Sequence, residues 1–383
     1  MTRSVFKLLI CFSLVNVSLL LNVVANATTL AYLYEVSIPV FSQSDKERKE
    51  ATKKAFEELL VRITGQREIV ASEPGQALLS QSRRYVRSFR YELLPPEVEF
   101  ERQRTATQPS TEAEALDEDD EIEKPQQQLV VSFDEAAVKN SLWKRKLPVW
   151  GKTRPSTLFW VAIQDHDQRK MLDASKLSET LMLIKSYAEK RGVPVIYPEL
   201  DVVDQRNINV TDVWGGFKSP LLGASERYKA DAIISAQLLL DQNNVWKTQW
   251  HLYQTGDESS WQLSAPDLSV VIDESIDKLA SALADRYAQV ASSDDQNQFY
   301  INISDVMNLE DYEKINRYLK SLAAVKRVEL AQIQSTELIY ELKLRSNPKA
   351  LKQAIALGKT LSTQDDPFSA DVENNRLNYR LNP

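Results

Sequence analysis

Hydrophobic and polar positions along the chain predict three successive groups of helices and strands. In the first group, residues 30–40 alternate between apolar and polar side chains, which is typical of a strand with one buried face. Ser44 and Glu47 form a capping-box pattern at the start of a helix that ends at Gly65. We expect the other elements to be a helix that starts after Pro74 and runs to Tyr85, strands over 89–94 and 128–133, and a short helix after Asp134. The pattern predicts a small α+β domain over residues 28–150.

The second group contains longer apolar runs. Residues 157–164 are almost continuously apolar, as expected of a central strand buried on both faces, and residues 272–287 carry apolar side chains at helical spacing. We expect the other elements to be a helix over 175–191, strands over 193–197, 245–253 and 260–263, and a buried strand within 228–240. This order predicts a layered α/β domain with a mixed sheet over residues 151–290. Because residues 161–175 contain no glycine, nucleotide binding of the Rossmann or P-loop type is disfavoured.

The third group follows a polar break and covers residues 298–383. We expect strands over 299–303, 325–334, 338–344 and 377–381, with helices after Asn308 and from Pro348. This βαββαβ order is a split βαβ arrangement. The predicted fold class is therefore a multidomain combination of α+β and α/β.

The N-terminus has the layout of a secretory signal peptide. Arg3 and Lys7 precede an apolar run over residues 8–24, which small residues follow up to Ala27. We expect cleavage after Ala27, which removes residues 1–27 and leaves no stable membrane span. Cleavage also removes Cys11, the only cysteine, so the mature chain forms no disulfide. The alternative, a lipoprotein acylated at Cys11, lacks the small residue expected before that cysteine.

Charge bears on the partners of this chain. The formal net charge is −7, and an acidic exported protein is a poor candidate for binding nucleic acid. Within residues 105–128, eight acidic residues lie between Glu112 and Glu123. We expect a disordered, solvated loop here, because such a composition buries too little apolar surface to offset its ordering entropy. A calcium site or an acidic docking segment is the alternative, although the calcium-hand pattern is absent.

Candidate chemistry is sparse. Asp165, His166 and Asp167 follow the predicted central strand, at the end where open α/β sheets bind ligands. This position is compatible with metal binding or acid–base chemistry. His251, the second histidine, lies in a predicted strand without a partner at ligand spacing. We therefore predict no catalytic site, no metal site and no cofactor.

Two Trp-Gly pairs are the more specific feature. Trp side chains stack on sugars or fill partner pockets, and glycine beside them permits close backbone approach. The other interpretation is that Trp150 and Trp214 fill a seam between domains, with Gly151 as a bend. In the binding interpretation, Arg154 pairs with a carboxylate of a partner or of a peptidoglycan stem. The predicted binding residues are Trp150, Gly151, Arg154, Trp214, Gly215, Gly216 and Phe217.

Several motifs together resemble one known family. They are "LYEVSIPV", "LVRITGQREIV", "LPVWGKTRPSTLFWVAI", "TDVWGGF", "ERYKADAIISAQL" and the terminal "LNYRLNP". They resemble the secreted Gram-negative family catalogued as domain of unknown function 2066, over nearly all of the mature chain. Members often end in Tyr-Arg-Trp-x-Pro, where this chain has Leu381 in place of the Trp. The resemblance implies an exported envelope protein without an established activity.

Three functions follow as hypotheses. The first is a non-catalytic periplasmic interaction protein that supports assembly or maintenance of the cell envelope, with an envelope protein as partner. The second is a module that binds peptidoglycan or another envelope glycan through the Trp-Gly pairs. The third is a hydrolase that uses two carboxylates, which requires a cleft holding both at catalytic separation. The sequence leaves the oligomeric state open.

Overall fold

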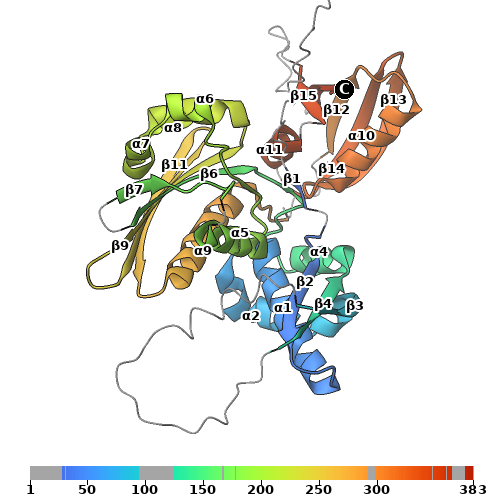
Figure 1. The fold of residues 1–383 in the computed structure, drawn as a ribbon. Coiled ribbons are helices and arrows are strands. Elements are labelled where there is room, and N and C mark those ends of the chain that lie inside the picture. Colours follow the sequence, from blue (N-terminus) through green and yellow to red (C-terminus); the bar gives the residue numbers. More distant parts are fainter. Residues whose placement is uncertain are drawn as a thin grey trace, which may run out of the picture.

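The computed structural model combines α+β and α/β units, which confirms the predicted fold class (Figure 1). The structure describes residues 28–30, 32–94, 125–165, 168–176, 178–291, 298–346, 348–358, 360–364 and 376–382. The predicted signal peptide, His166 and residues 105–124 of the predicted acidic loop lie outside the described residues. None of the described helices has the length and apolar character that crossing a membrane requires.

The N-terminal domain is a three-stranded antiparallel sheet packed against helix α1 (Asp45–Thr64). The strand order is β2 (Glu35–Val40), β4 (Gln127–Phe133), β3 (Val86–Leu93). The other elements are the 3₁₀ turns Arg67–Ala71 and Ser82–Tyr85 and the helices α2 (Glu73–Leu79) and α4 (Glu135–Lys144). Strand β2 begins at Glu35, whereas the predicted strand began at residue 30. The difference arises because residues 32–34 form a turn that leaves Tyr32 77% exposed.

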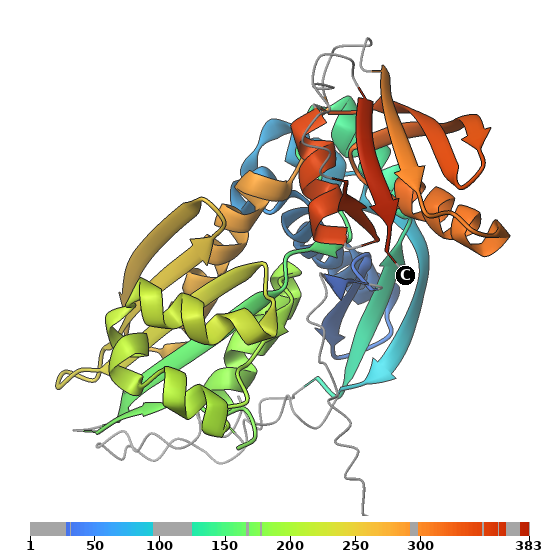
Figure 2. The ribbon, with the colours of Figure 1, turned by 90° about the horizontal axis from the view of Figure 1, so that it is seen from above.

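The middle domain is built on a six-stranded mixed sheet. Strand β6 (Thr157–Asp165) lies in its centre, parallel to β8 (Val195–Ile196) and β9 (Ala232–Leu240). Antiparallel neighbours complete the sheet: β7 (Gln168–Met171), β10 (Trp246–Gln254) and β11 (Asp257–Ala265). Helices α5 (Glu179–Arg191) and α9 (Leu268–Tyr287) cover one face, and α6 (Val202–Asn207), α7 (Val210–Gly215) and α8 (Lys218–Ser225) cover the other (Figure 2).

The double cover explains the apolar run of the central strand. Phe159 packs on the side of α5 and α9, while Trp160 packs on the side of α7 and α8, and both side chains are 0% exposed. The Trp160 indole donates a hydrogen bond to Ser225 Oγ at 2.9 Å, which satisfies its buried N–H.

The C-terminal module has the predicted βαββαβ order with one additional short strand. Its sheet runs β13 (Val325–Gln334), β14 (Glu337–Leu344), β12 (Gln298–Ser304), β16 (Arg376–Leu381), β15 (Leu361–Thr363). Helices α10 (Leu309–Ser321) and α11 (Pro348–Gly358) contribute to the same core. Strands β13 and β15 are therefore the two edges of this sheet.

Gln289, just after α9, links the C-terminal module to the other domains. Its main chain pairs with Val149, and its side-chain oxygen accepts a hydrogen bond from Ser346 Oγ at 2.9 Å. Its amide nitrogen donates to the carbonyl oxygen of Ala350 at 3.3 Å. A short ladder between β1 (Thr28–Thr29) and β5 (Thr153–Arg154) lies in the same region. The three domains thus meet around residues 149–154.

Candidate functional site

The first predicted Trp-Gly pair lies inside the seam between the N-terminal and middle domains. Trp150 is 1% exposed, and its backbone N–H donates to the carbonyl oxygen of Ile63 at 2.7 Å. The guanidinium carbon of Arg154 lies 3.7 Å from the centroid of the Trp150 ring. A Cβ on Gly151 would lie 3.2 Å from Ala323 Cβ, so this glycine lets the C-terminal module approach the seam.

Arg154 is fully buried and donates its hydrogen bonds to main-chain carbonyl groups. The acceptors are Gly151 at 2.7 Å, Arg62 at 3.0 Å, Trp150 at 3.1 Å and Gly192 at 3.4 Å. Burial lowers the pKa of the Arg154 guanidinium, and Tyr34 opposes this shift. The predicted contact with a partner carboxylate has no exposed guanidinium to use in this structure, because the enclosed side chain joins α1, residues 150 and 151 and the end of α5.

The second Trp-Gly pair lies on the other side of the middle sheet, at the end of α7. Gly216 ends this helix with φ at 61°, and a Cβ there would lie 2.4 Å from His251 Cδ2. Tyr253 donates to the Gly216 carbonyl oxygen at 2.5 Å. The Trp214 ring lies under Arg169, with 4.3 Å between the guanidinium carbon and the ring centroid.

The seven predicted binding residues lie in two separate places in this structure. The two Trp-Gly pairs belong to different cores, one beside α9 and one beside α7 and α8. A Cβ on Gly215 would lie 2.7 Å from the ring of Phe217, which is 52% exposed. These seven residues therefore do not converge on a common ligand.

The histidines do not build a site within the described residues. His251 is half-buried against Gly216, and burial lowers its pKa while Glu258 opposes this effect. Across the part of the chain that the structure describes, no group of three or more His, Cys, Asp or Glu side chains could hold a metal ion.

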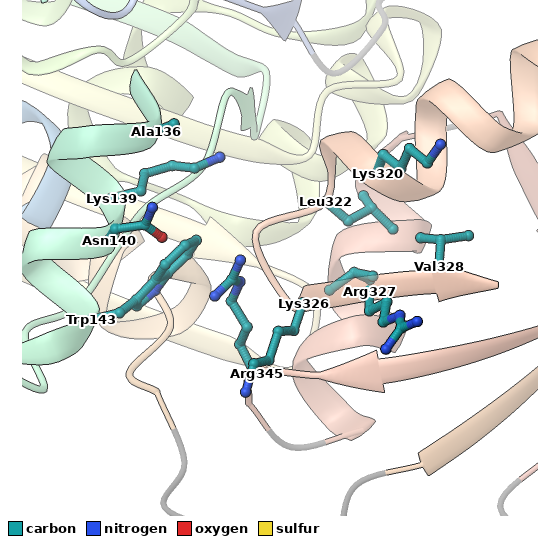
Figure 3. Close-up of a pocket in the computed structure, with 11 residues that line it drawn as sticks. Ala136, Lys139, Asn140, Trp143, Lys320, Leu322, Lys326, Arg327, Val328 and Arg345 are labelled. Carbon is teal, nitrogen blue, oxygen red and sulfur yellow. The ribbon is translucent and has the colours of Figure 1, made fainter. Parts of the chain in front are cut away.

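A basic cleft lies between α4 and the C-terminal module (Figure 3). Its volume is about 440 Å³. The lining residues are Ala136, Lys139, Asn140 and Trp143 from one side, and Lys320, Leu322, Val325, Lys326, Arg327, Val328 and Arg345 from the other. This lining contains five cationic side chains and neither aspartate nor glutamate.

Helix α4 forms the first wall. Asp134 caps this helix by accepting a hydrogen bond from the Ala137 N–H at 2.9 Å. Lys139 and Asn140 precede Trp143 by four and three residues, so the helix presents them on the same face as Trp143, toward the cleft (Figure 3). Lys139 also pairs with Glu135 at 3.0 Å.

The second wall comes from the start of β13, the end of β14 and the end of α10. The backbone N–H of Arg345 donates to the Ala324 carbonyl oxygen at 2.7 Å, which holds the end of β14 beside the start of β13. Lys320 and Lys326 from the neighbouring backbone belong to the same lining (Figure 3). Arg327 pairs with the exposed Glu329 along its own strand.

Arg345 and Trp143 form the contact across the cleft. The Arg345 guanidinium carbon lies 3.9 Å from the Trp143 ring centroid, which is a close cation–π arrangement. Arg345 Nε is buried without a hydrogen-bond partner, and no described carboxylate pairs with this guanidinium. Burial lowers the pKa of Arg345, because the charged form loses solvation. The structure therefore keeps a half-buried cation with unused hydrogen-bonding capacity beside an aromatic ring.

The cleft is suited to binding an anion. The lining carries five cations and no carboxylate, and Lys139 and Arg327 pair with Glu135 and Glu329 just outside it. The cations outnumber these two carboxylates, so the local field is positive although the whole chain has a formal net charge of −7. Guanidinium and ammonium groups form short, charge-assisted hydrogen bonds with carboxylate or phosphate oxygens. Cations on both walls of the cleft can therefore pair with the separate anionic groups of one ligand.

This cleft was not predicted from the sequence. Trp143 and Arg345 come from different domains, so no local pattern connects them. Two local signals were present: Lys139 and Trp143 lie at helical spacing on a helix correctly placed after Asp134, and Lys326 and Arg327 start a predicted strand.

One part of the chain matches a known family model. Residues 27–151 match the family model described as a domain of unknown function, DUF8605. No curated protein matches the chain. A solved structure titled "Crystal structure of uncharacterized protein" is 12% identical, with a TM-score of 0.17, and its match covers 35% of this chain and 91% of that one.

The family match corrects the resemblance drawn from the sequence motifs. The matched model is DUF8605, whereas the motifs were assigned to domain of unknown function 2066, so that assignment is wrong. Two segments of these motifs, "LPVWG" and "TRPST", contain the enclosed Trp150 and Arg154. Expectations that came from the 2066 resemblance lose that support.

Proposed function

We propose that this protein is a non-catalytic interaction protein of the cell envelope that holds an acidic segment of a partner protein in the basic cleft. The observation that carries the proposal is Arg345, which lies on Trp143 with a buried, unpartnered Nε and no carboxylate among the lining residues. The proposed periplasmic location rests on the signal-peptide pattern of residues 1–27.

The shape and composition of the cleft favour a peptide with several carboxylates. Its cations are distributed over both walls, so several separated anionic groups can be paired at once (Figure 3). The Trp143 ring and the side chains of Leu322 and Val325 add apolar surface for the aliphatic part of a peptide. The volume of about 440 Å³ accommodates a few residues.

The other two hypotheses gain no support from the cleft or the seam. Glycan binding was expected at the Trp-Gly pairs, where Trp150 is enclosed. The hydrolase hypothesis requires two carboxylates in one cleft, and the described cleft is lined by cations.

Replacement of Arg345 by glutamine is expected to weaken binding of an acidic peptide about tenfold, because one charge-assisted interaction at the centre of the cleft is lost. The probe is fluorescein-labelled hexaglutamate, and fluorescence anisotropy gives its dissociation constant for the full chain. Trp143→Leu is expected to weaken binding as well, since it removes the ring beneath Arg345. Affinity for the wild-type chain should fall as sodium chloride is raised.

Arg206→Gln is the matched control, since Arg206 is exposed on α6 in the middle domain. It should leave the dissociation constant of hexaglutamate unchanged. Circular dichroism checks that each variant is folded. Equal affinities for wild type, Arg345→Gln and Arg206→Gln, or no binding by a folded wild-type chain, would refute the proposed function.

A further inference from the structure

Strand β13 has a long edge along which no described strand is paired. It is ten residues long, pairs with β14 on one side and is the outermost strand of its five-stranded sheet. An edge strand exposes backbone N–H and C=O groups that can bind a further strand, and proteins commonly shorten or cover such edges.

The second half of β13 is exposed on both of its faces. Residues from Glu329 to Gln334 are all exposed, without the alternation of a strand that has one face in a core. Among them, Leu330 is 36% exposed and Ile333 is 64% exposed. A register shift between Leu330 and Gln332 interrupts the ladder with β14 at this point. The apolar side chains on this part of the hairpin therefore lie uncovered beside the open edge.

The basic cleft adjoins the first half of the same edge. Four consecutive residues of β13, from Val325 to Val328, line the cleft. A register shift between Val325 and Arg327 interrupts the regular pairing with β14 here, so the start of β13 is irregular where it borders the cleft. Trp143 and Lys139 of α4 face this end of the strand (Figure 3). The strand that lines the cleft with its first residues therefore carries the exposed Leu330 and Ile333 in its second half.

We propose that the partner segment binds in an extended conformation and adds to β13 as a further strand, with its acidic residues in the basic cleft and its apolar residues beside Leu330 and Ile333. The inference rests on the proposed function and gives the binding mode at the same site. Main-chain hydrogen bonds supply affinity in strand addition, and side-chain contacts supply specificity. Charge at one end and apolar surface at the other fix the register of the added strand.

The test compares hexaglutamate with longer peptides that carry the same six glutamates joined to Val-Thr-Val-Thr-Val, placed before the glutamates in one peptide and after them in the other. Anisotropy measurements use the full chain. At least one longer peptide is expected to bind about tenfold more tightly than hexaglutamate. N-methylation of the tail, which removes its backbone donors, should abolish this gain.

Hydrogen exchange gives the second measurement. The longer peptide is expected to slow amide exchange in residues 329–334 of β13, whereas hexaglutamate is not. Strand β15, the opposite edge of the same sheet, is the matched control and should be unaffected. Ile333→Ser should reduce the gain from the tail while it leaves hexaglutamate binding intact, because Ile333 lies outside the cleft lining.

The outcomes separate the two proposals. If the folded wild-type chain does not bind hexaglutamate, the proposed function fails. If hexaglutamate binds but the tail adds nothing, or the N-methylated tail binds equally well, strand addition is overturned and the proposed function stands. A second copy of the chain is the competing occupant of this edge. A dimer in sedimentation equilibrium that Ile333→Ser converts to monomer would also overturn the inference.

Discussion

Replacement of Arg154 by methionine is expected to lower the free energy of unfolding by about 4 kcal/mol, because several buried carbonyl groups lose their donor. The side chain is 0% exposed and donates to four main-chain oxygens, three of them within 3.1 Å. A buried acceptor left without a partner costs about 1–3 kcal/mol, and methionine fills the volume without replacing any of these bonds. Urea unfolding, followed by circular dichroism, measures the loss.

Lysine should not rescue this position. Its single ammonium group cannot reproduce the planar fork with which Arg154 reaches Arg62, Gly151 and Gly192 at once. Arg154→Lys is therefore expected to be destabilised nearly as much as Arg154→Met. Arg83→Met is the control, since Arg83 is exposed, and its effect should stay within about 0.5 kcal/mol. A change of less than about 1 kcal/mol in Arg154→Met would contradict the structural role of this guanidinium.

Periodicity predicted the elements that contribute most to the cores. The apolar run over residues 157–164 became β6, which is covered on both faces, and the helical spacing over 272–287 became α9. Ser44 caps α1 and Gly65 ends it with φ at 76°, as their residue types predicted. Such elements are predictable because burial of one or two faces determines where apolar side chains must recur.

The helices between residues 202 and 225 were not predicted, because they are short and lack a long apolar stripe. Their start signals were nevertheless present in the sequence. Asp201 accepts hydrogen bonds from Val203 N–H and Asp204 N–H, and Asn209 caps α7 with a full capping box. Short helices depend more on caps and tertiary packing than on periodicity, so the caps were the stronger evidence here.

The candidate site could not be predicted from local sequence. Trp150 and Trp214 occur in similar Val-Trp-Gly motifs, yet one is enclosed in a domain seam and the other packs beside Arg169. A motif identifies residue types, whereas exposure depends on what the rest of the chain places beside them. Trp143 and Arg345 are brought together only when α4 and the end of β14 meet, which is a long-range consequence of the fold.

Gly65→Ala is expected to destabilise the protein by about 3 kcal/mol, because a side chain there is strained and meets another element. The φ of 76° costs about 1 kcal/mol for a residue with a Cβ. In addition, the new Cβ would lie 1.9 Å from Ala284 Cβ on α9, so α1 and α9 would have to separate. Arg191 and Ser281 both donate to the Gly65 carbonyl oxygen, which restrains this adjustment.

Ala284→Gly removes the opposing Cβ and provides the decisive comparison. Alone it should cost about 1 kcal/mol, the usual penalty of glycine in a helix. Combined with Gly65→Ala, it should remove the clash between the two Cβ atoms. The unfolding free energy of the double variant should therefore fall by about 2 kcal/mol, which leaves it more stable than Gly65→Ala alone. Urea unfolding of the four proteins measures this coupling. If the two losses of unfolding free energy simply add, α1 and α9 do not pack closely at Gly65. If the double variant is more stable than Gly65→Ala, the N-terminal and middle domains are in contact at Gly65 and Ala284, as the seam requires.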